Sequence, residues 1–222
     1  RPSIRLASLM DINSVFIFTH DSIYLGEDGP THQPIEHLVT LRSTPNLINW
    51  RPADLVETAV AWKEAVISTS TPSCLVFSRQ GTSAIQRTSE QLEAIHKGGY
   101  LLKSCDNPDI TIIASGSEVQ LALDSSKELE NDSIKSNVVS MPSLDKFFEM
   151  PEEYKNTILN TDKPMLVVEC SHPNSWYKIL NRNDKVLGIE SFGESAPGSQ
   201  LMEHFGFTVS NVIKMAKSLL DD

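Results

Sequence analysis

One short segment of this sequence gathers residue types that move protons and bind hydroxyl groups. Residues 19–34, THDSIYLGEDGPTHQP, hold two histidines, three carboxylates, two glycines and two prolines. Histidine exchanges protons near neutral pH, and carboxylates accept hydrogen bonds from sugar hydroxyls. Glycine and proline can hold such side chains on a fixed, turn-rich backbone. The segment therefore predicts a ligand-binding loop.

Each residue of this loop also has a purely structural interpretation. His20 could end a strand at the surface, and His32 could bond to backbone at a helix entry. Asp21 and Asp28 are types that turns and helix caps commonly use. The conjunction of all these types in sixteen residues favours the functional interpretation.

Arg79 is a second candidate because it follows an apolar run, Leu75 to Phe77. A guanidinium there can meet a phosphate with two parallel hydrogen bonds. The structural alternative is a salt bridge at a strand end. Together with His20, Arg79 predicts a local cationic pocket in an otherwise acidic protein.

Composition excludes several classes of protein. The 222 residues carry a formal net charge of -10, which argues against a broad nucleic-acid or anionic-membrane surface. No apolar run reaches the roughly 18 residues that span a bilayer. Three cysteines, Cys74, Cys105 and Cys170, are widely separated, odd in number and lack metal-ligand spacing, so we expect neither a disulfide framework nor a zinc module. A reducing cytoplasm is the simplest expected location.

Apolar runs that alternate with helical periodicity predict an α/β fold with a mostly parallel sheet. Strands are expected at residues 15–19, 47–50, 75–77, 111–114, 137–140, 165–168 and 186–189. Helices are expected near residues 35–41, 55–66, 90–96, 118–129, 176–180 and 210–219. The first strand is apolar on both faces, which indicates a buried strand. Ligands bind beyond the carboxyl ends of parallel strands, where the loop at residues 19–34 would emerge.

Three helix starts have recognisable signals. Asp54 and Glu57 have the spacing of a capping box. The turn at residues 115–118, SGSE, either caps the next helix or exposes backbone N–H groups to an anion, and we favour the cap. Ser210 is expected to cap the last helix, which carries an apolar stripe of Val212, Ala216 and Leu219.

The weak pattern between the two halves predicts a linker. We expect a first, incomplete α/β domain at residues 1–86, a linker at 87–108 and a smaller α/β domain at 109–222.

The segment at residues 20–34 resembles the pyrimidine-domain signature of the transketolase family. Further stretches resemble that family in the same order along the chain: residues 46–54, 78–80, 98–100, 115–119, 138–143, 192–197 and 205–208. The lead-in His20-Asp21-Ser22 favours transketolase over the related deoxyxylulose-phosphate synthases. Tyr24 and Gly81 depart from the family pattern, which commonly has glycine and asparagine there.

The resemblance implies a fold and an activity. The fold would be an incomplete pyrimidine-type domain of thiamine-diphosphate enzymes, followed by a transketolase-like C-terminal domain. Transketolases move a two-carbon ketol unit between ketose and aldose phosphates in the pentose phosphate pathway. They use thiamine diphosphate with a divalent metal, magnesium or calcium, and work as homodimers.

The resemblance also implies roles for four residues. His20 and Arg79 would hold the substrate phosphate, and Asp28 would bond a substrate hydroxyl. His32 would contact the reacting ketol and act catalytically in proton transfer. No cofactor-binding or metal-binding residue is assigned in this chain.

Because the resemblance begins partway through the pyrimidine domain, we expect the chain to be a C-terminal portion that is inactive alone. The alternative is a non-catalytic module of transketolase type that dimerises or binds sugar phosphates.

Overall fold

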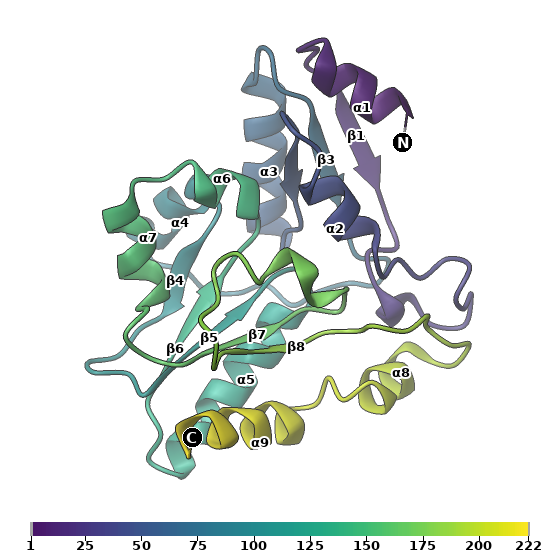
Figure 1. Cartoon of the computed structure of the whole chain (residues 1–222). Helices are drawn as coiled ribbons and strands as arrows, with labels where there is room; N and C mark the ends of the chain where they lie inside the picture. The colour runs from purple at the N-terminus through teal and green to yellow at the C-terminus, as the bar shows by residue number, and fades with distance from the viewer. Residues whose placement is uncertain (1, 222) are drawn as a thin grey trace.

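The computed structural model describes residues 2–221, which form two α/β domains around separate sheets (Figure 1). The first domain contains the parallel strands β1 (Val15–Phe18), β2 (Ile48–Trp50) and β3 (Ser73–Val76) in the order β1-β3-β2. Its helices are α1 (Pro2–Leu9), η1 (Ile23–Leu25), α2 (His37–Arg42) and α3 (Leu55–Ile67). The expected α/β class is confirmed.

Strand β1 is an edge strand, and the expectation that it is buried is wrong. β3 is its only partner among residues 2–221, and the side chains of Ile17 and Phe18 are 52% and 38% exposed. A strand that is apolar on both faces resembles a central strand in sequence, whatever its position in the sheet. Position in the sheet depends on pairing with distant residues, which the local pattern does not contain.

Helix α3 begins at the expected cap. The carboxylate of Asp54 accepts a hydrogen bond from the backbone N–H of Glu57 at 3.1 Å. The carboxylate of Glu57 accepts from the backbone N–H of Ala53, one residue before the position a capping box would use. Half of the expected capping box therefore forms, and Glu57 is turned into the protein interior.

The second domain contains the strands β4 (Tyr100–Lys103), β5 (Ile110–Ala114), β6 (Ser136–Ser140), β7 (Met165–Val168) and β8 (Lys185–Leu187). They lie in the order β4-β6-β5-β7-β8, with β4 antiparallel to β6 and the other pairs parallel. One face packs on α5 (Glu118–Asn131) and α9 (Val209–Leu220), and the other on α6 (Leu144–Phe148) and α7 (Glu152–Leu159). This mixed sheet is thus covered on both faces, as parallel pairings require.

The region expected as a linker holds regular structure. It contains α4 (Ser89–Ala94), which overlaps the helix expected near residues 90–96, then η2 (Ile95–Lys97) and β4. Thr88 and Gln91 form a capping box at the start of α4. The sequence pattern did not predict β4, because the apolar stretch of this edge strand is short. The domain limits at residues 86 and 109 stay a prediction.

Two other expectations near the C-terminus are wrong. The helix expected near residues 176–180 does not form: residues 176–179 form turns after η3 (Pro173–Ser175), and the indole N–H of Trp176 donates to the buried carboxylate of Glu169. Helix α9 is capped by Thr208, whose side chain accepts from the N–H of Asn211, and not by Ser210. The expected apolar stripe of α9 is confirmed as buried. Helix α8 (Gly198–His204) was not expected.

No helix among residues 2–221 is both long enough and apolar enough to cross a bilayer.

Candidate active site

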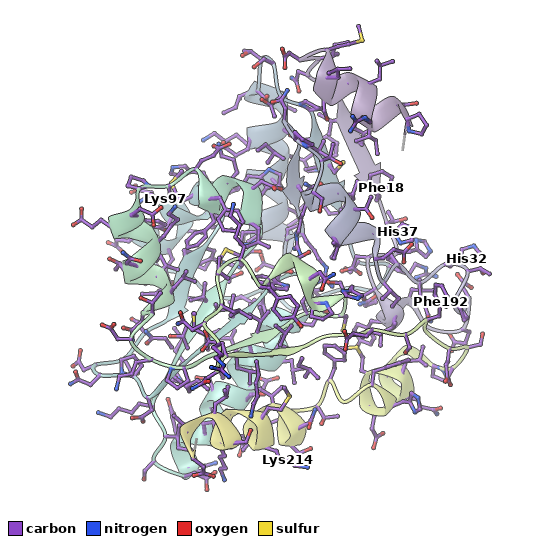
Figure 2. The ribbon with its side chains drawn as sticks, in the orientation of Figure 1. Phe18, His32, His37, Lys97, Phe192 and Lys214 are labelled. Atoms are coloured by element: carbon purple, nitrogen blue, oxygen red, sulfur yellow. The ribbon has the colours of Figure 1, made fainter. Side chains whose placement is uncertain are left out.

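His20 and His32 lie on one cavity of about 450 Å³ beyond the carboxyl end of β1. Phe18, Asp21, His37 and Phe192 are among the other residues that line it. Figure 2 shows Phe18, His32, His37 and Phe192 on the same side of the molecule. Phe192 comes from the second domain, so both domains contribute to the cavity wall.

The two histidines are held in the same way. The hydroxyl of Thr19 lies 2.8 Å from Nδ1 of His20, and the hydroxyl of Thr31 lies 2.9 Å from Nδ1 of His32. Each ring is thereby paired through one nitrogen with the threonine that precedes it. Nε2 is the nitrogen that such a bond leaves for a ligand or a transferred proton.

His20 adopts a left-handed backbone conformation, with φ of 63°. This conformation is uncommon for residues other than glycine and costs on the order of 1 kcal/mol or more. The next residue fixes it, because the buried carboxylate of Asp21 accepts a hydrogen bond from Nε of Arg51 at 2.9 Å. The bend at His20 therefore turns Asp21 inward to Arg51 while His20 itself stays at the cavity.

Asp28 and Arg79 do not line this cavity. Asp28 is exposed in the turn that contains Gly29, whose φ is 77°. Arg79 is exposed in the bend after β3. The structure thus brings together two of the four residues that the sequence singles out, His20 and His32, and their roles stay predictions.

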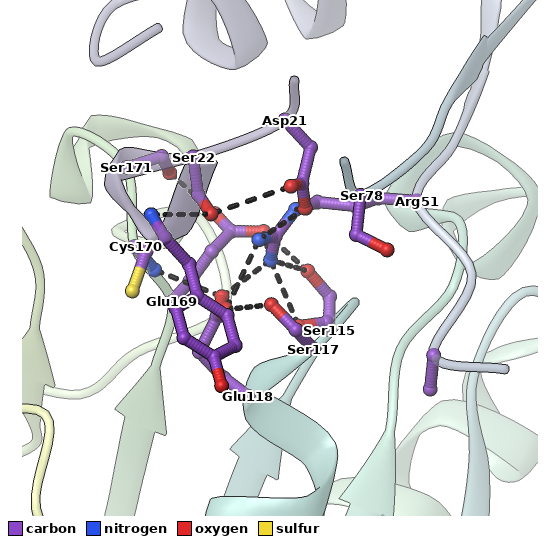
Figure 3. A network of polar contacts seen from close by, with 12 residues as sticks. Asp21, Ser22, Arg51, Ser78, Ser115, Ser117, Glu118, Glu169, Cys170 and Ser171 are labelled. Carbon is purple, nitrogen blue, oxygen red and sulfur yellow. Dashed lines mark hydrogen bonds and ion pairs between the residues drawn. The ribbon is translucent and has the colours of Figure 1, made fainter. Parts of the chain in front are cut away.

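Arg51 lies at the centre of a buried polar network between the two domains (Figure 3). Its Nη1 donates to Oε2 of Glu118 at 2.5 Å and to the carbonyl oxygen of Ser115 at 2.8 Å. Burial opposes the charge of Arg51, but Glu118 and Asp21 raise its pKa well above the ordinary value. The guanidinium therefore remains charged inside the protein.

Glu169 is the second centre of this network. Its carboxylate accepts two hydrogen bonds from Arg42, both at 2.8 Å, and one from the indole N–H of Trp176 at 2.7 Å. The hydroxyls of Ser115 and Ser171 also donate to it. Burial alone would raise the pKa of Glu169, but Arg42 and Arg51 hold it well below its usual range. A charged carboxylate is thus fully paired in the interior.

The turn at residues 115–118 serves this network and does not cap α5 with a side chain. Ser117 makes no side-chain cap bond, and its hydroxyl donates instead to Glu118. The backbone of Gly116, with φ of 59°, lies against the guanidinium of Arg51. The favoured capping interpretation is therefore wrong, because Arg51 and Glu169 attract the polar groups of the turn.

The sequence contains a signal for this network that no single motif shows. Arg51 follows β2, Ser115 follows β5 and Glu169 follows β7, so polar residues stand directly after three apolar strands. Carboxyl ends of parallel strands meet at one edge of a sheet. Arg51 follows a strand of the first sheet, and Glu169 follows a strand of the second sheet. Opposite charges at these two sheet edges indicate a polar interface between the domains.

A second buried network joins α3 to the second domain. The carboxylate of Asp54 accepts from Nη1 of Arg87 at 2.7 Å, and that of Glu57 accepts from the hydroxyl of Tyr100 at 2.6 Å. Burial and the neighbouring Glu57 raise the pKa of Tyr100, so its hydroxyl remains a donor. The two domains are therefore joined by ionic networks at two places.

Comparisons with known proteins agree with this architecture. The family model of the transketolase pyrimidine-binding domain matches residues 1–83, and that of the transketolase-like C-terminal domain matches residues 98–208. These matches define a chain with a pyrimidine-binding domain followed by a C-terminal domain, as the two sheets do.

Two curated relatives are similar to nearly the whole chain. Transketolase 1 of Vibrio parahaemolyticus is 47% identical over 99% of this chain and 33% of its own length. Transketolase 1 of Escherichia coli is 46% identical over 99% of this chain and 34% of its own length. A solved transketolase of Pichia stipitis in complex with sedoheptulose 7-phosphate is 41% identical, with a TM-score of 0.94 over 99% of this chain and 32% of that one. The chain belongs to the transketolase family and spans about a third of the length of these relatives.

Transketolases are thiamine-diphosphate enzymes, and the described residues do not by themselves fit that cofactor with its metal. Residues 2–221 contain no group of three or more histidines, cysteines or acidic residues that could hold a metal ion. At the cavity, the buried carboxylate of Asp21 is already bonded to Arg51. In the part of the chain that the structure describes, the residues at this cavity therefore offer no ligand set for a metal-bound diphosphate.

Proposed function

We propose that this chain is the C-terminal portion of a transketolase and supplies the substrate-side residues of its active site. The reaction is the transfer of a two-carbon ketol unit between ketose and aldose phosphates, within the pentose phosphate pathway. The observation that carries this proposal is the shared cavity of His20 and His32 beyond the carboxyl end of β1. The Pichia stipitis relative was solved with a ketose phosphate, which agrees with this substrate class.

His32 is the proposed catalytic residue. Its Nδ1 is paired with the Thr31 hydroxyl, so Nε2 is placed to exchange a proton with a hydroxyl of the reacting ketol. His20 is held in the same manner and would bond an oxygen of the same sugar phosphate. The aromatic ring of Phe192 forms an apolar wall of the cavity against the carbon atoms of the sugar.

Arg79 and Asp28 are proposed as the outer contacts of the substrate. Arg79 is exposed after the carboxyl end of β3, where its guanidinium can take a phosphate bidentately. Asp28 is exposed in the same loop as His32 and can accept a hydrogen bond from a sugar hydroxyl. Both side chains are accessible to a ligand that extends out of the cavity.

The remainder of the enzyme would supply the cofactor site. Thiamine diphosphate and its divalent metal, magnesium or calcium, would be held by residues outside this chain, and the ketol chemistry depends on them. The chain alone would therefore be inactive, and the complete enzyme would be a homodimer. We propose domain limits at residues 1–86 and 109–222 with a connecting segment at 87–108, and a cytoplasmic location that suits the three free thiols.

The test is complementation. The chain is coexpressed with the N-terminal part of a transketolase, and transfer is measured from sedoheptulose 7-phosphate to an aldose phosphate. We expect transfer in the combination and none in either part alone. His32→Ala should abolish it, whereas His96→Ala, which changes an exposed histidine of η2, should leave it intact.

The alternative, a non-catalytic module, predicts the opposite result in this test. A combination that folds and associates but transfers nothing would favour the module. Activity that survives His32→Ala would contradict the role of this residue.

A further inference from the structure

Gln33 follows His32 in the chain and ties the candidate loop to the second domain. Its side chain is 3% exposed, and its Nε2 donates to the carbonyl oxygens of Gly26 and Glu194, both at 2.9 Å. The first bond closes the loop on itself. The second bond reaches the segment at residues 192–198, which follows β8, so one amide group holds the loop and the second domain together.

Gly193 makes this contact possible. A Cβ atom at position 193 would lie 1.7 Å from Oε1 of Gln33, a distance that two non-bonded atoms cannot adopt. Any larger residue at this position would push Gln33 away. Phe192, the residue before Gly193, lines the same cavity as His32. The contact between Gln33 and Gly193 therefore lies next to two residues of the cavity wall, His32 and Phe192.

A second hydrogen bond between the loop and the second domain lies a few residues away. The hydroxyl of Ser195 donates to the carbonyl oxygen of Glu27 at 2.5 Å. A Cβ atom at Gly29 would lie 2.7 Å from the Ser195 hydroxyl oxygen, so the backbone of the loop passes close to this side chain. Two side-chain hydrogen bonds thus connect the loop around His32 to the second domain, and the one from Gln33 is buried.

We propose that Gln33 is a positioning residue, through which the second domain fixes His32 in the cavity. The inference rests on the proposed function only for the identity of the ligand. Without the amide donor, the carbonyl oxygens of Gly26 and Glu194 lose a shared partner, and the loop is free to move relative to Phe192. Displacements on the order of 1 Å in a supporting residue are enough to lower the efficiency of a binding site.

The test uses the full chain with ¹³C-labelled histidine. Gln33→Met keeps the length of the side chain but removes the donors, and Gly193→Ala perturbs the contact from the second domain. Gln200→Met changes an exposed glutamine of α8 and is the matched control. The readouts are the imidazole NMR signals of His32 and His96, the affinity for ribose 5-phosphate and the urea unfolding midpoint.

We expect both test variants to shift the His32 signal and leave that of His96 unchanged. Affinity for ribose 5-phosphate should fall on the order of tenfold. Gln200→Met should change none of these. Should Gln33→Met fail to fold, Gln33→Asn keeps the amide on a side chain one methylene shorter and should shift His32 in the same direction by less.

A His32 signal that stays unchanged in the folded Gln33 and Gly193 variants would overturn the proposal. A His32 shift in a chain that binds no ribose 5-phosphate would support the positioning role and count against the proposed substrate. The His32 signal thus tests the role of Gln33, and the affinity for ribose 5-phosphate tests the substrate.

Discussion

Arg51 and Glu118 form a buried ion pair that joins the two domains. Arg51 follows β2 of the first sheet, and Glu118 is the first residue of α5 in the second domain. Their side chains are 1% and 0% exposed, and two hydrogen bonds connect them. Arg51 also holds Asp21, the neighbour of His20, so this ion pair links the domain interface to the candidate site.

Neutralising one member of this pair should destabilise the protein. Glu118→Gln keeps the shape of the side chain but leaves the Arg51 charge less compensated in the interior. We expect a loss of about 3–5 kcal/mol in the free energy of unfolding, measured by urea titration at pH 7. Glu152→Gln, in an exposed ion pair with Lys155, should cost about 0.5 kcal/mol or less. Equal losses in the two variants would show that the buried ion pair contributes no more to stability than the exposed one.

The stability of the protein should fall in acid. Burial opposes ionisation of Glu169 and Asp54, but Arg42 and Arg87 respectively lower the pKa of each in the folded state. In the unfolded chain these groups have pKa values of about 4.3 and 3.9. Their contribution is therefore complete above about pH 5 and is lost as the pH falls toward the lower folded values.

Urea unfolding midpoints between pH 7 and pH 3 measure this effect. The midpoint should decline below about pH 5, and Glu169→Gln should make the decline shallower while lowering the midpoint at pH 7. A midpoint that rises on acidification would contradict the assignment of a charged Glu169 in the folded state.

Gly116 should tolerate no side chain. Its φ is 59°, and a Cβ atom would lie 2.6 Å from Cζ of Arg51, which is fixed by its buried partners. We expect Gly116→Ala to lose about 2–4 kcal/mol in the free energy of unfolding. Gly81→Ala is the control, because a Cβ there meets nothing within 4 Å. Thermal unfolding of the two variants side by side distinguishes the positions, and a stable Gly116→Ala protein would refute the close contact.

Arg79 should matter for the phosphate and not for the fold. The exposed guanidinium is expected to bind the phosphate group of the substrate. Arg79→Ala should weaken binding of ribose 5-phosphate on the order of tenfold or more, with an unchanged unfolding midpoint. Binding of unphosphorylated ribose, measured by the same titration, should not change. Equal affinity of parent and variant for the sugar phosphate would remove Arg79 from the site.

Local sequence patterns predicted most of the helices and strands, but not which of them pack against one another. Alternating apolar runs located β5, β6 and β7 closely, because buried parallel strands carry long apolar stretches. On α3, the large apolar residues Leu55, Trp62 and Val66 recur at helical spacing but are exposed, and the small residues Ala61 and Ala65 face the core. Helical periodicity identifies an apolar face, but the packing partner decides which face of the helix is buried.

The candidate site was predictable only where its residues are adjacent in sequence. His20 and His32 belong to one loop, and their types and spacing indicated a shared site. Arg51, Gln33 and Ser195 hold the loop through hydrogen bonds between residues that are 30 to 168 positions apart in the sequence. No local pattern encodes such contacts. The close approach of Gly193 likewise becomes visible only in three dimensions.

In the proposed site, His20 and His32 together bind a sugar phosphate. The most direct measurement is a titration of the ¹³C-histidine-labelled chain with ribose 5-phosphate, followed by NMR. The imidazole signals of His20 and His32 should move with one common dissociation constant, while that of His96 stays in place. Signals of His20 and His32 that do not move, or that move with unrelated constants, would contradict a shared site.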